Sequence, residues 1–320
     1  MKPRILWKLL LIGCVVFVHA GPCTAQEIST PAISGKRYIR LIALASPFSK
    51  DNWMLSEKRG LSKDYTAQDV LEIIEDLQPD CLERFITGCP DPSALVPVRE
   101  GHAPMTVLEF LNKAILAGGE TCHIVPKLNL EWLKNERGAA YFWKAARELY
   151  ELPLVRPIRN INLDVWDVFC KEIAPTPEKR ARFFRKLRKI GYEQIGVNMT
   201  GMYRINDPQL DYADFNIDKN TWKVNRKALE TLNGYSNLKQ LFMYIDYPGA
   251  MDAFRKNTPD RQAQIYCEEI FPLQQELGFI FVYPIIQDSW DASAVITGKD
   301  GPFGGKTMYD ITRELLFRSK

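Results

Sequence analysis

Residues Arg159–Asp167, RNINLDVWD, decide the fold that the sequence predicts. Apolar and polar side chains alternate along this stretch, with Ile161, Leu163 and Val165 on one side and Asn160, Asn162, Asp164 and Trp166 on the other. Such alternation is typical of a strand with one wet face. The stretch nevertheless lies between two helical patterns, which favours a parallel strand covered by helices. A barrel reconciles the two patterns, because the apolar set can face the helices while Asn162 and Asp164 face the barrel interior and its mouth.

Strand and helix patterns alternate along the rest of the chain. Strands are expected at 37–47, 81–87, 122–130, 159–167, 194–200, 238–247 and 279–286, with a short eighth strand at 293–297. Thr66-Ala-Gln-Asp69 is a capping box that starts one helix, and Thr176-Pro177-Glu178 starts another that Gly191 ends. Loops before the strands are short, whereas loops after them, such as 201–224, are long and polar.

This asymmetry predicts an α/β fold of the (β/α)8 TIM-barrel type, with its site at the carboxyl ends of the strands. The chain has 320 residues, a length that suits one such domain. A doubly wound open sheet is the alternative, and it would bind its ligand at a single switch point.

Three segments are expected: a signal peptide at 1–25, a linker at 26–36 and the barrel at 37–320. The first segment combines Lys2, Arg4 and Lys8 with the apolar run Leu9–Ala20 and a small-residue cleavage site at Cys23-Thr24-Ala25. The run is shorter than the roughly 20 residues of a membrane span. We therefore expect a secreted or periplasmic protein without a stable membrane anchor, and a lipobox-like LIGC at 11–14 leaves lipidation as an alternative.

Removal of residues 1–25 makes the chain neutral. The sequence has 42 basic and 39 acidic residues, and Lys2, Arg4 and Lys8 leave with the signal peptide, so 39 balance 39. A neutral chain gives no electrostatic basis for binding nucleic acid.

The cysteines and histidines indicate no metal site. The five cysteines of the mature chain show no C-x-x-C spacing, and they are Cys81, Cys89, Cys122, Cys170 and Cys267. A disulfide between Cys81 and Cys122 and buried free thiols are both compatible with this pattern. His102 and His123 are isolated, so we expect no histidine metal site and no cofactor, while a carboxylate-bound Ca²⁺ or Mg²⁺ stays open. Residues 300–307, DGPFGGKT, lack the first glycine of a P-loop and predict a turn.

Polar residues recur where the expected strands end. Three carboxylates are the candidate catalytic residues: Asp164, Glu83 and Asp246. The candidate substrate-binding residues are Lys127, Asn129, Trp166, Asn198, Tyr244, Gln287, Asp288 and Trp290. Carboxylates that share a mouth perturb one another's pKa, which suits acid–base chemistry on a glycosidic bond, and flat aromatic rings suit sugar rings. Taken singly, each acid is also compatible with a structural ion pair and each aromatic ring with core packing.

Two of these strands resemble those of family 18 chitinase-like barrels. That family carries an M-x-Y-D run on its sixth strand, to which the run MYIDY at Met243–Tyr247 is similar, and alternating acids that end in Glu on its fourth. The series from Asn160 to Trp166 has no closing Glu, so the acid donor of the family is missing and its mechanism is not implied. The resemblance implies a glycosidase-type (β/α)8 barrel.

The leading hypothesis is an exported glycoside hydrolase-like enzyme that acts on carbohydrate at the barrel mouth by Asp/Glu acid–base chemistry. A carbohydrate-binding barrel without turnover is the second hypothesis, because no complete catalytic motif is present. A carboxylate-metal-dependent lyase or hydrolase is the third.

Overall fold

A computed structural model describes most of the chain between residues 66 and 216 and parts of the remainder. The described residues are 40–44, 66–79, 81–85, 89–199, 206–216, 236–238, 240–244, 264, 267–268, 280–287, 290–291 and 314. The expected signal peptide (1–25) and linker (26–36) lie outside them, as do 293–297 and 300–307. No helix within the described ranges is long and apolar enough to cross a membrane.

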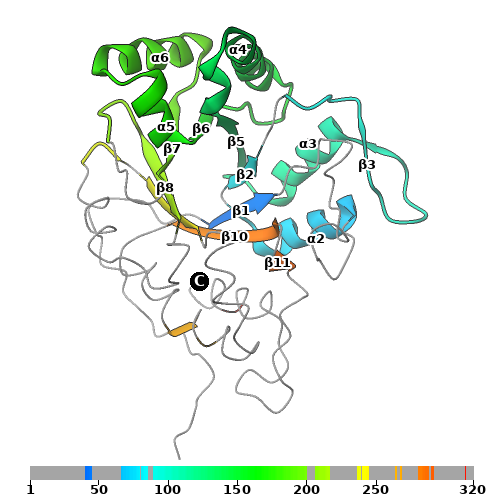
Figure 1. Cartoon of the computed structure of the whole chain (residues 1–320). Coiled ribbons are helices and arrows are strands. Elements are labelled where there is room, and N and C mark those ends of the chain that lie inside the picture. The colour runs from blue at the N-terminus through cyan, green and yellow to red at the C-terminus, as the bar shows by residue number, and fades with distance from the viewer. Residues whose placement is uncertain are drawn as a thin grey trace, which may run out of the picture.

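Nine strands form one curled sheet, and its parallel pairing returns to its starting strand (Figure 1). The order is β1 (Arg40–Leu44), β2 (Cys81–Phe85), β5 (His123–Asn129), β6 (Asn160–Asp164), β7 (Gln194–Met199), β8 (Tyr212–Asn216), β9 (Gln240–Tyr244) and β10 (Ile280–Gln287). β10 pairs in parallel with β1, and the short β11 (Trp290–Asp291) adds to β10 antiparallel. The expected α/β class with a curled parallel sheet is thus confirmed. The open-sheet alternative is wrong, because β1 has a partner on both sides.

One strand of the ring was not expected. β8 lies inside the segment 201–224, which the sequence predicts to be a loop. Its residues YADFN include Asp214 and Asn216, types that are depleted in strands, so the pattern is weak. β8 takes the sixth place in the ring, which makes β10 the eighth strand. The strand that pairs with β1 is therefore β10 and not 293–297.

Helices and a small hairpin lie between the first five strands of the ring. The helices are α2 (Ala67–Leu77), α3 (Val107–Ala117), α4 (Glu136–Glu151), the short α5 (Trp166–Val168) and α6 (Pro177–Ile190), with a 3-10 turn η1 (Leu130–Lys134) and a π turn η2 (Phe169–Ile173). The hairpin pairs β3 (Leu95–Val96) with β4 (Met105–Thr106).

Local sequence signals set the ends of these helices. Thr66 and Asp69 form the expected capping box of α2, and Thr106 and Glu109 form a second one at α3. Thr176 caps α6 with Pro177 in its first turn, and Gly191 ends it at a φ of 124°. The predicted starts of α2 and α6 and the predicted end of α6 are thus confirmed.

The two faces of the sheet differ in chemistry. Alternate strand residues join one hydrophobic cluster with Phe110, Phe142 and Phe184 of the helices; from the strands these are Leu82, Ile124, Leu128, Ile161, Leu163, Ile195 and Val197. The residues between them point to the ring interior, because side chains alternate along a strand. Lys127, Asn162 and Asn198 are buried on that side. Barrel interiors are usually filled by bulky branched apolar residues, so this interior is unusually polar.

Candidate functional site

Strand register brings polar residues of five neighbouring strands into rows. Lys127 is paired with Asn162 and Asn129 with Asp164 across β5 and β6. Across β7, β8 and β9 the pairs are Asn198 with Asp214, and Asn216 with Tyr244. Residues paired in this way on parallel strands lie on the same face of the sheet. These rows occupy the carboxyl halves of their strands, which is where barrel enzymes place their sites.

Three polar side chains on the interior face are almost completely buried. Lys127 is 3% exposed, Asn162 is 1% exposed and Asn198 is 2% exposed. Burying an amide or an ammonium without polar partners is costly, so the surroundings of these groups must be polar. Asn198 Oδ1 has no hydrogen-bond partner among the described residues, and it therefore offers an acceptor to a ligand or to water.

Asp164 is half-buried and ends β6. Its Oδ1 accepts a hydrogen bond of 3.0 Å from the backbone N–H of Val165. Val165 has φ 62° and ψ 43°, a left-handed conformation that a β-branched residue rarely adopts. This hydrogen bond fixes the position of the carboxylate at the strand end. It uses Oδ1 only, so Oδ2 does not take part in the turn.

The left-handed Val165 also overturns one expectation. The alternation of β6 ends there, so Trp166 does not follow Asp164 into the interior. Trp166 starts α5, is 0% exposed and packs against Phe169 and Phe184 with ring centroids 5.4 and 5.8 Å away. The expected substrate-binding role of Trp166 is therefore wrong, because its ring belongs to the hydrophobic core.

Asn129 caps a turn in addition to being paired with Asp164 across β5 and β6. Its side-chain oxygen accepts a hydrogen bond of 2.7 Å from the backbone N–H of Glu131 and so caps η1. The half-buried side chain still lies level with Asp164. Asn129 can therefore contribute its amide N–H groups to the mouth.

Glu83 lies on β2, level with Ala43 and Val125. Lys127 is two residues further along β5, and Asn129, the partner of Asp164, is two further again. The register therefore puts Glu83 and Asp164 in different rows.

The remaining candidates are placed by backbone alone or not at all. Tyr244 ends β9, Gln287 ends β10, and Trp290 on β11 pairs with Gln287. Asp246 and Asp288 lie outside the described residues. Within the described residues, no group of three or more His, Cys, Asp or Glu side chains is arranged to hold a metal ion.

Sequence reasoning missed the contribution of β8. Asp214 and Asn216 stand level with Asn198 and Tyr244, and Tyr212 stands level with Gly196. A Cβ at position 196 would overlap the Tyr212 ring, so only glycine leaves room for that ring in the interior. The alternation of Tyr212, Asp214 and Asn216 is the signal that could have revealed this strand.

Comparisons with known proteins bear on the fold. No protein-family model and no curated protein sequence matches the chain. Among solved structures, a GH113 β-1,4-mannanase matches 89% of this chain and 100% of its own with 12% identity and a TM-score of 0.50. An O-GlcNAc hydrolase mutant from Thermobaculum terrenum covers 89% of this chain and 64% of its own chain, with 12% identity and a TM-score of 0.42. A xylanase-α-amylase inhibitor protein covers 77% of this chain and 93% of its own chain, with 10% identity and a TM-score of 0.43.

The likeness to the mannanase supports a glycosidase-type barrel as the fold of this chain. The comparisons do not single out the family 18 chitinase-like barrels, so the resemblance holds only at the level of the fold.

Proposed function

We propose that this protein is an exported, glycoside hydrolase-like enzyme that takes a neutral carbohydrate at the carboxyl end of its strand ring. The observation that carries the proposal is the set of polar rows on β5 to β9, in an interior that is usually apolar. The mannanase, a protein of the same fold class, is named for an activity on carbohydrate, which supports the same reading.

The chemistry of the rows suits sugar hydroxyls. Asn162 and Asn198 offer amide groups that both donate and accept, Lys127 donates, and Asp164 accepts. A sugar presents several hydroxyls that each donate one hydrogen bond and accept others, so alternating donors and acceptors match it better than they match a uniformly charged ligand.

Asp164 is the proposed catalytic carboxylate. It stands at a strand end, with one oxygen held by the Val165 N–H and the other available to protonate or deprotonate a glycosidic oxygen or a water. Hydrolysis needs a second carboxylate, at about 5 Å for retention or roughly 6.5–9.5 Å for inversion. Asp246 is the proposed partner, because the register places Glu83 two rows away from Asp164.

A carbohydrate-binding barrel without turnover is the second candidate. Two observations favour it: β6 ends in Asp164 without a following Glu, and Asp164 already stabilises the left-handed turn at Val165. Under this proposal the same polar rows bind the sugar and no glycosidic bond is cleaved.

The test is a panel of neutral glycans, mannans included, incubated with the wild type and with Asp164→Asn. Asparagine keeps the Oδ1 acceptor for the Val165 N–H, so the turn is retained while acid–base function is lost. We expect product formation to fall at least about 100-fold with an unchanged Tm. Glu75→Gln on the outer helix α2 makes the same chemical change far from the rows and is expected to keep full activity.

Three results separate the candidates. Full activity in Asp164→Asn removes Asp164 from the mechanism. Binding of a glycan by calorimetry, without product from the wild type, favours the binding barrel. Neither binding nor product across the panel overturns both proposals.

A further inference from the structure

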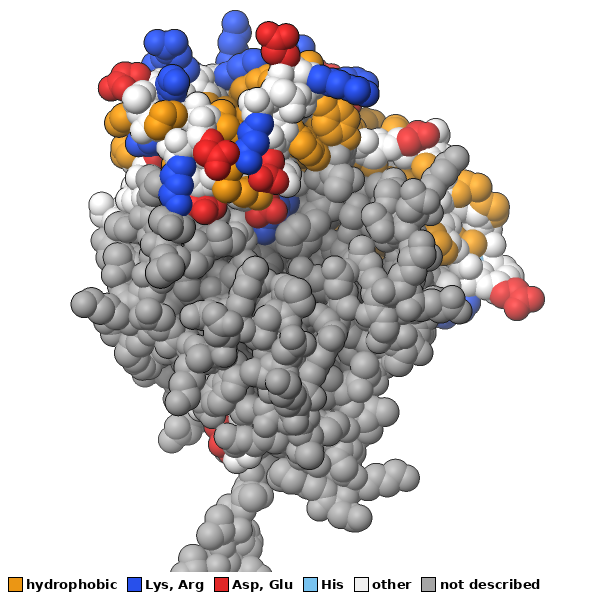
Figure 2. All heavy atoms as spheres, in the orientation of Figure 1, with side chains coloured by type: hydrophobic (Ala, Val, Ile, Leu, Met, Phe, Trp, Pro, Cys, Tyr) orange, Lys and Arg blue, Asp and Glu red, His pale blue; other side chains and the backbone are white. Residues whose placement is uncertain are grey.

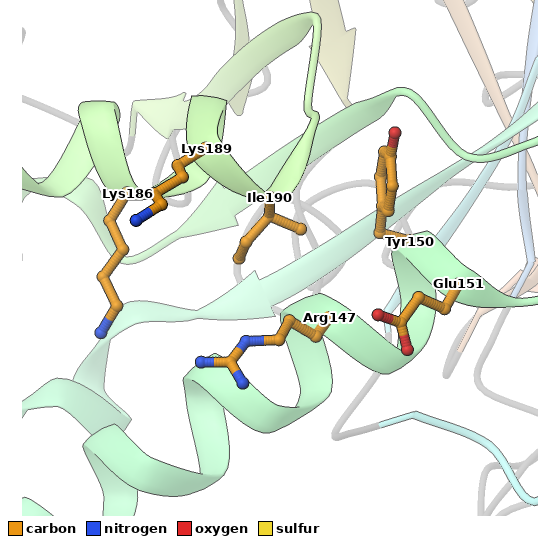
Figure 3. A pocket seen from close by; sticks show the side chains of 6 residues that line it. All are labelled: Arg147, Tyr150, Glu151, Lys186, Lys189 and Ile190. Carbon is orange, nitrogen blue, oxygen red and sulfur yellow. The ribbon is translucent and has the colours of Figure 1, made fainter.

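A groove opens between α4 and α6 on the outside of the ring (Figure 3). Its volume is about 580 Å³, and it is lined by Arg147, Tyr150 and Glu151 of α4 and by Lys186, Lys189 and Ile190 of α6. A second hollow of about 580 Å³ extends it along α4 to Trp143 and Ala140. These volumes lie within the range of about 300–1,000 Å³ that is typical of small-molecule sites.

The groove lies at the end of the ring opposite to the polar rows. Glu151 is the last residue of α4, and the chain then runs to the start of β6; Ile190 is the last residue of α6, and the chain then runs to the start of β7. The groove therefore flanks the amino ends of these strands, whereas Asp164 ends β6. A ligand in the groove would be independent of the proposed sugar site.

Positive charge is concentrated around the groove. Helix α6 has one acid, Glu178, against the basic residues Lys179, Arg180, Arg182, Arg185, Lys186, Arg188 and Lys189. Figure 2 shows Lys and Arg side chains over α4 and α6, with Asp and Glu side chains among them. Two of these cations are neutralised, since Arg180 binds Asp207 at 2.9 Å and Arg188 binds Asp211 at 2.6 Å.

The cations that line the groove have no such partner. Arg147, Lys186 and Lys189 form no ion pair with any described residue. The Lys186 ammonium lies 3.8 Å from the centroid of the Trp143 ring. Partial burial and the neighbouring Arg147 lower the pKa of Lys186. The two cations therefore repel each other in the folded protein, and a bound anion would relieve that repulsion.

Helix dipoles account for only part of this charge. Lys189 lies in the last turn of α6, where a cation offsets the partial negative charge of the helix end. The last turn of α4 has no basic residue, and both Arg147 and Lys186 precede the final turn of their helices. Stabilisation of the helix ends therefore does not explain why Arg147 and Lys186 lie side by side.

We propose that the groove between α4 and α6 binds a sugar acid, a sugar ring that carries a carboxylate. Arg147, Lys186 and Lys189 would bind the carboxylate, Glu151 would accept hydrogen bonds from ring hydroxyls, and Ile190 offers apolar surface to the ring. The carboxylates of Glu148 and Glu151 along the groove disfavour a continuous phosphate chain, since each would repel a phosphate. A concave groove also suits a small ligand better than a membrane surface.

The experiment uses the mature chain and isothermal titration calorimetry at low salt. The probe is glucuronate, beside its neutral counterpart glucose. We expect glucuronate to bind and glucose to bind at least tenfold more weakly.

Matched variants locate the site. The double variant Arg147→Gln, Lys186→Gln should raise Kd at least tenfold. Its Tm should change little, because loss of the Lys186–Trp143 contact is offset by relief of the Arg147–Lys186 repulsion. Lys179→Gln, Arg182→Gln removes the same charge from α6 outside the groove and should leave Kd within about twofold. Asp164→Asn should leave Kd unchanged, which separates the groove from the proposed sugar site.

Three results would overturn the proposal. These are no binding of glucuronate, an equal loss of binding in the two double variants, and tighter binding of duplex DNA or anionic phosphatidylserine vesicles than of glucuronate. The second result would indicate general attraction by the basic surface, and the third would assign that surface to a different class of partner.

Discussion

At the scale of single residues, Val165 has the strongest influence on the candidate site. Its left-handed backbone ends β6, fixes the carboxylate of Asp164 and sends Trp166 into the core. The inward positions of Asn162 and Asp164 could be predicted from alternation alone. The position of the Trp166 side chain in the core could not be predicted, because the conformational preferences of valine do not favour a positive φ.

The strain at Val165 is testable by substitution. The left-handed conformation costs a residue such as valine about 1–2 kcal/mol, and asparagine tolerates it. We expect Val165→Asn to leave the free energy of unfolding unchanged or to raise it by up to about 1 kcal/mol, since relief of strain offsets the loss of half-buried apolar contacts. Urea denaturation measures the difference.

Val168→Asn serves as the control for Val165. Val168 is also half-buried but has a right-handed φ of −63°, so no strain is relieved and about 1 kcal/mol should be lost. Equal losses in the two variants would contradict a strained Val165.

At the scale of elements, sequence signals were strong where capping and periodicity agreed. Thr66 with Asp69 and Thr176 with Pro177 mark helix starts that the structure confirms. β8 was missed because Tyr212–Asn216 is short and carries Asp214 and Asn216, and because tertiary pairing with β7 and β9 overrides that weak local preference. The site residues on β8 were missed for the same reason.

The capping box of α3 makes the stability depend on pH. The Thr106 backbone N–H and hydroxyl donate to Glu109 at 2.7 and 2.9 Å, and these hydrogen bonds lower the pKa of Glu109 below its usual 4.5. A carboxylate whose pKa is lower in the folded state stabilises the protein above its unfolded pKa, and this contribution is lost as pH falls through the folded value.

Glu109→Ala should therefore lower the free energy of unfolding at pH 7, and the difference from the wild type should shrink as pH falls below 4.5. Denaturant titrations at pH 7 and at pH 3 measure both values. Glu120→Ala, at an exposed turn position after α3, should leave the stability unchanged at both pH values. A difference for Glu109→Ala that does not change with pH would show that ionisation of Glu109 contributes nothing.

At the scale of the whole molecule, the ring divides the chain into an apolar outer layer and a polar interior. The sequence predicted this division because polar residues such as Lys127, Asn162 and Asn198 alternate with apolar ones on successive strands. It could not predict which strand closes the ring. Closure depends on pairing between Arg40–Leu44 and Ile280–Gln287, which are distant in sequence, and local patterns do not encode such pairing.

The layered packing also decides the state of the cysteines. Cys81, Cys122, Cys170 and Cys267 are buried and Cys89 is half-buried, and none of these five forms a disulfide with another described residue. The disulfide that we considered between Cys81 and Cys122 is thus absent. Burial raises the pKa of Cys89 to about 11, with help from Glu148, and raises the pKa of Cys170 to about 12. Thiols with such pKa values are mostly protonated at pH 8 and are poor nucleophiles.

We therefore expect a chain that starts after residue 25 to react slowly with Ellman's reagent at pH 8 while it is folded. After unfolding in guanidinium chloride without reductant, all five thiols should react, because burial no longer protects them. Prior reduction with dithiothreitol is the control, and it should leave that number unchanged. A count lower by two before reduction and restored after it would reveal a disulfide and contradict the structure.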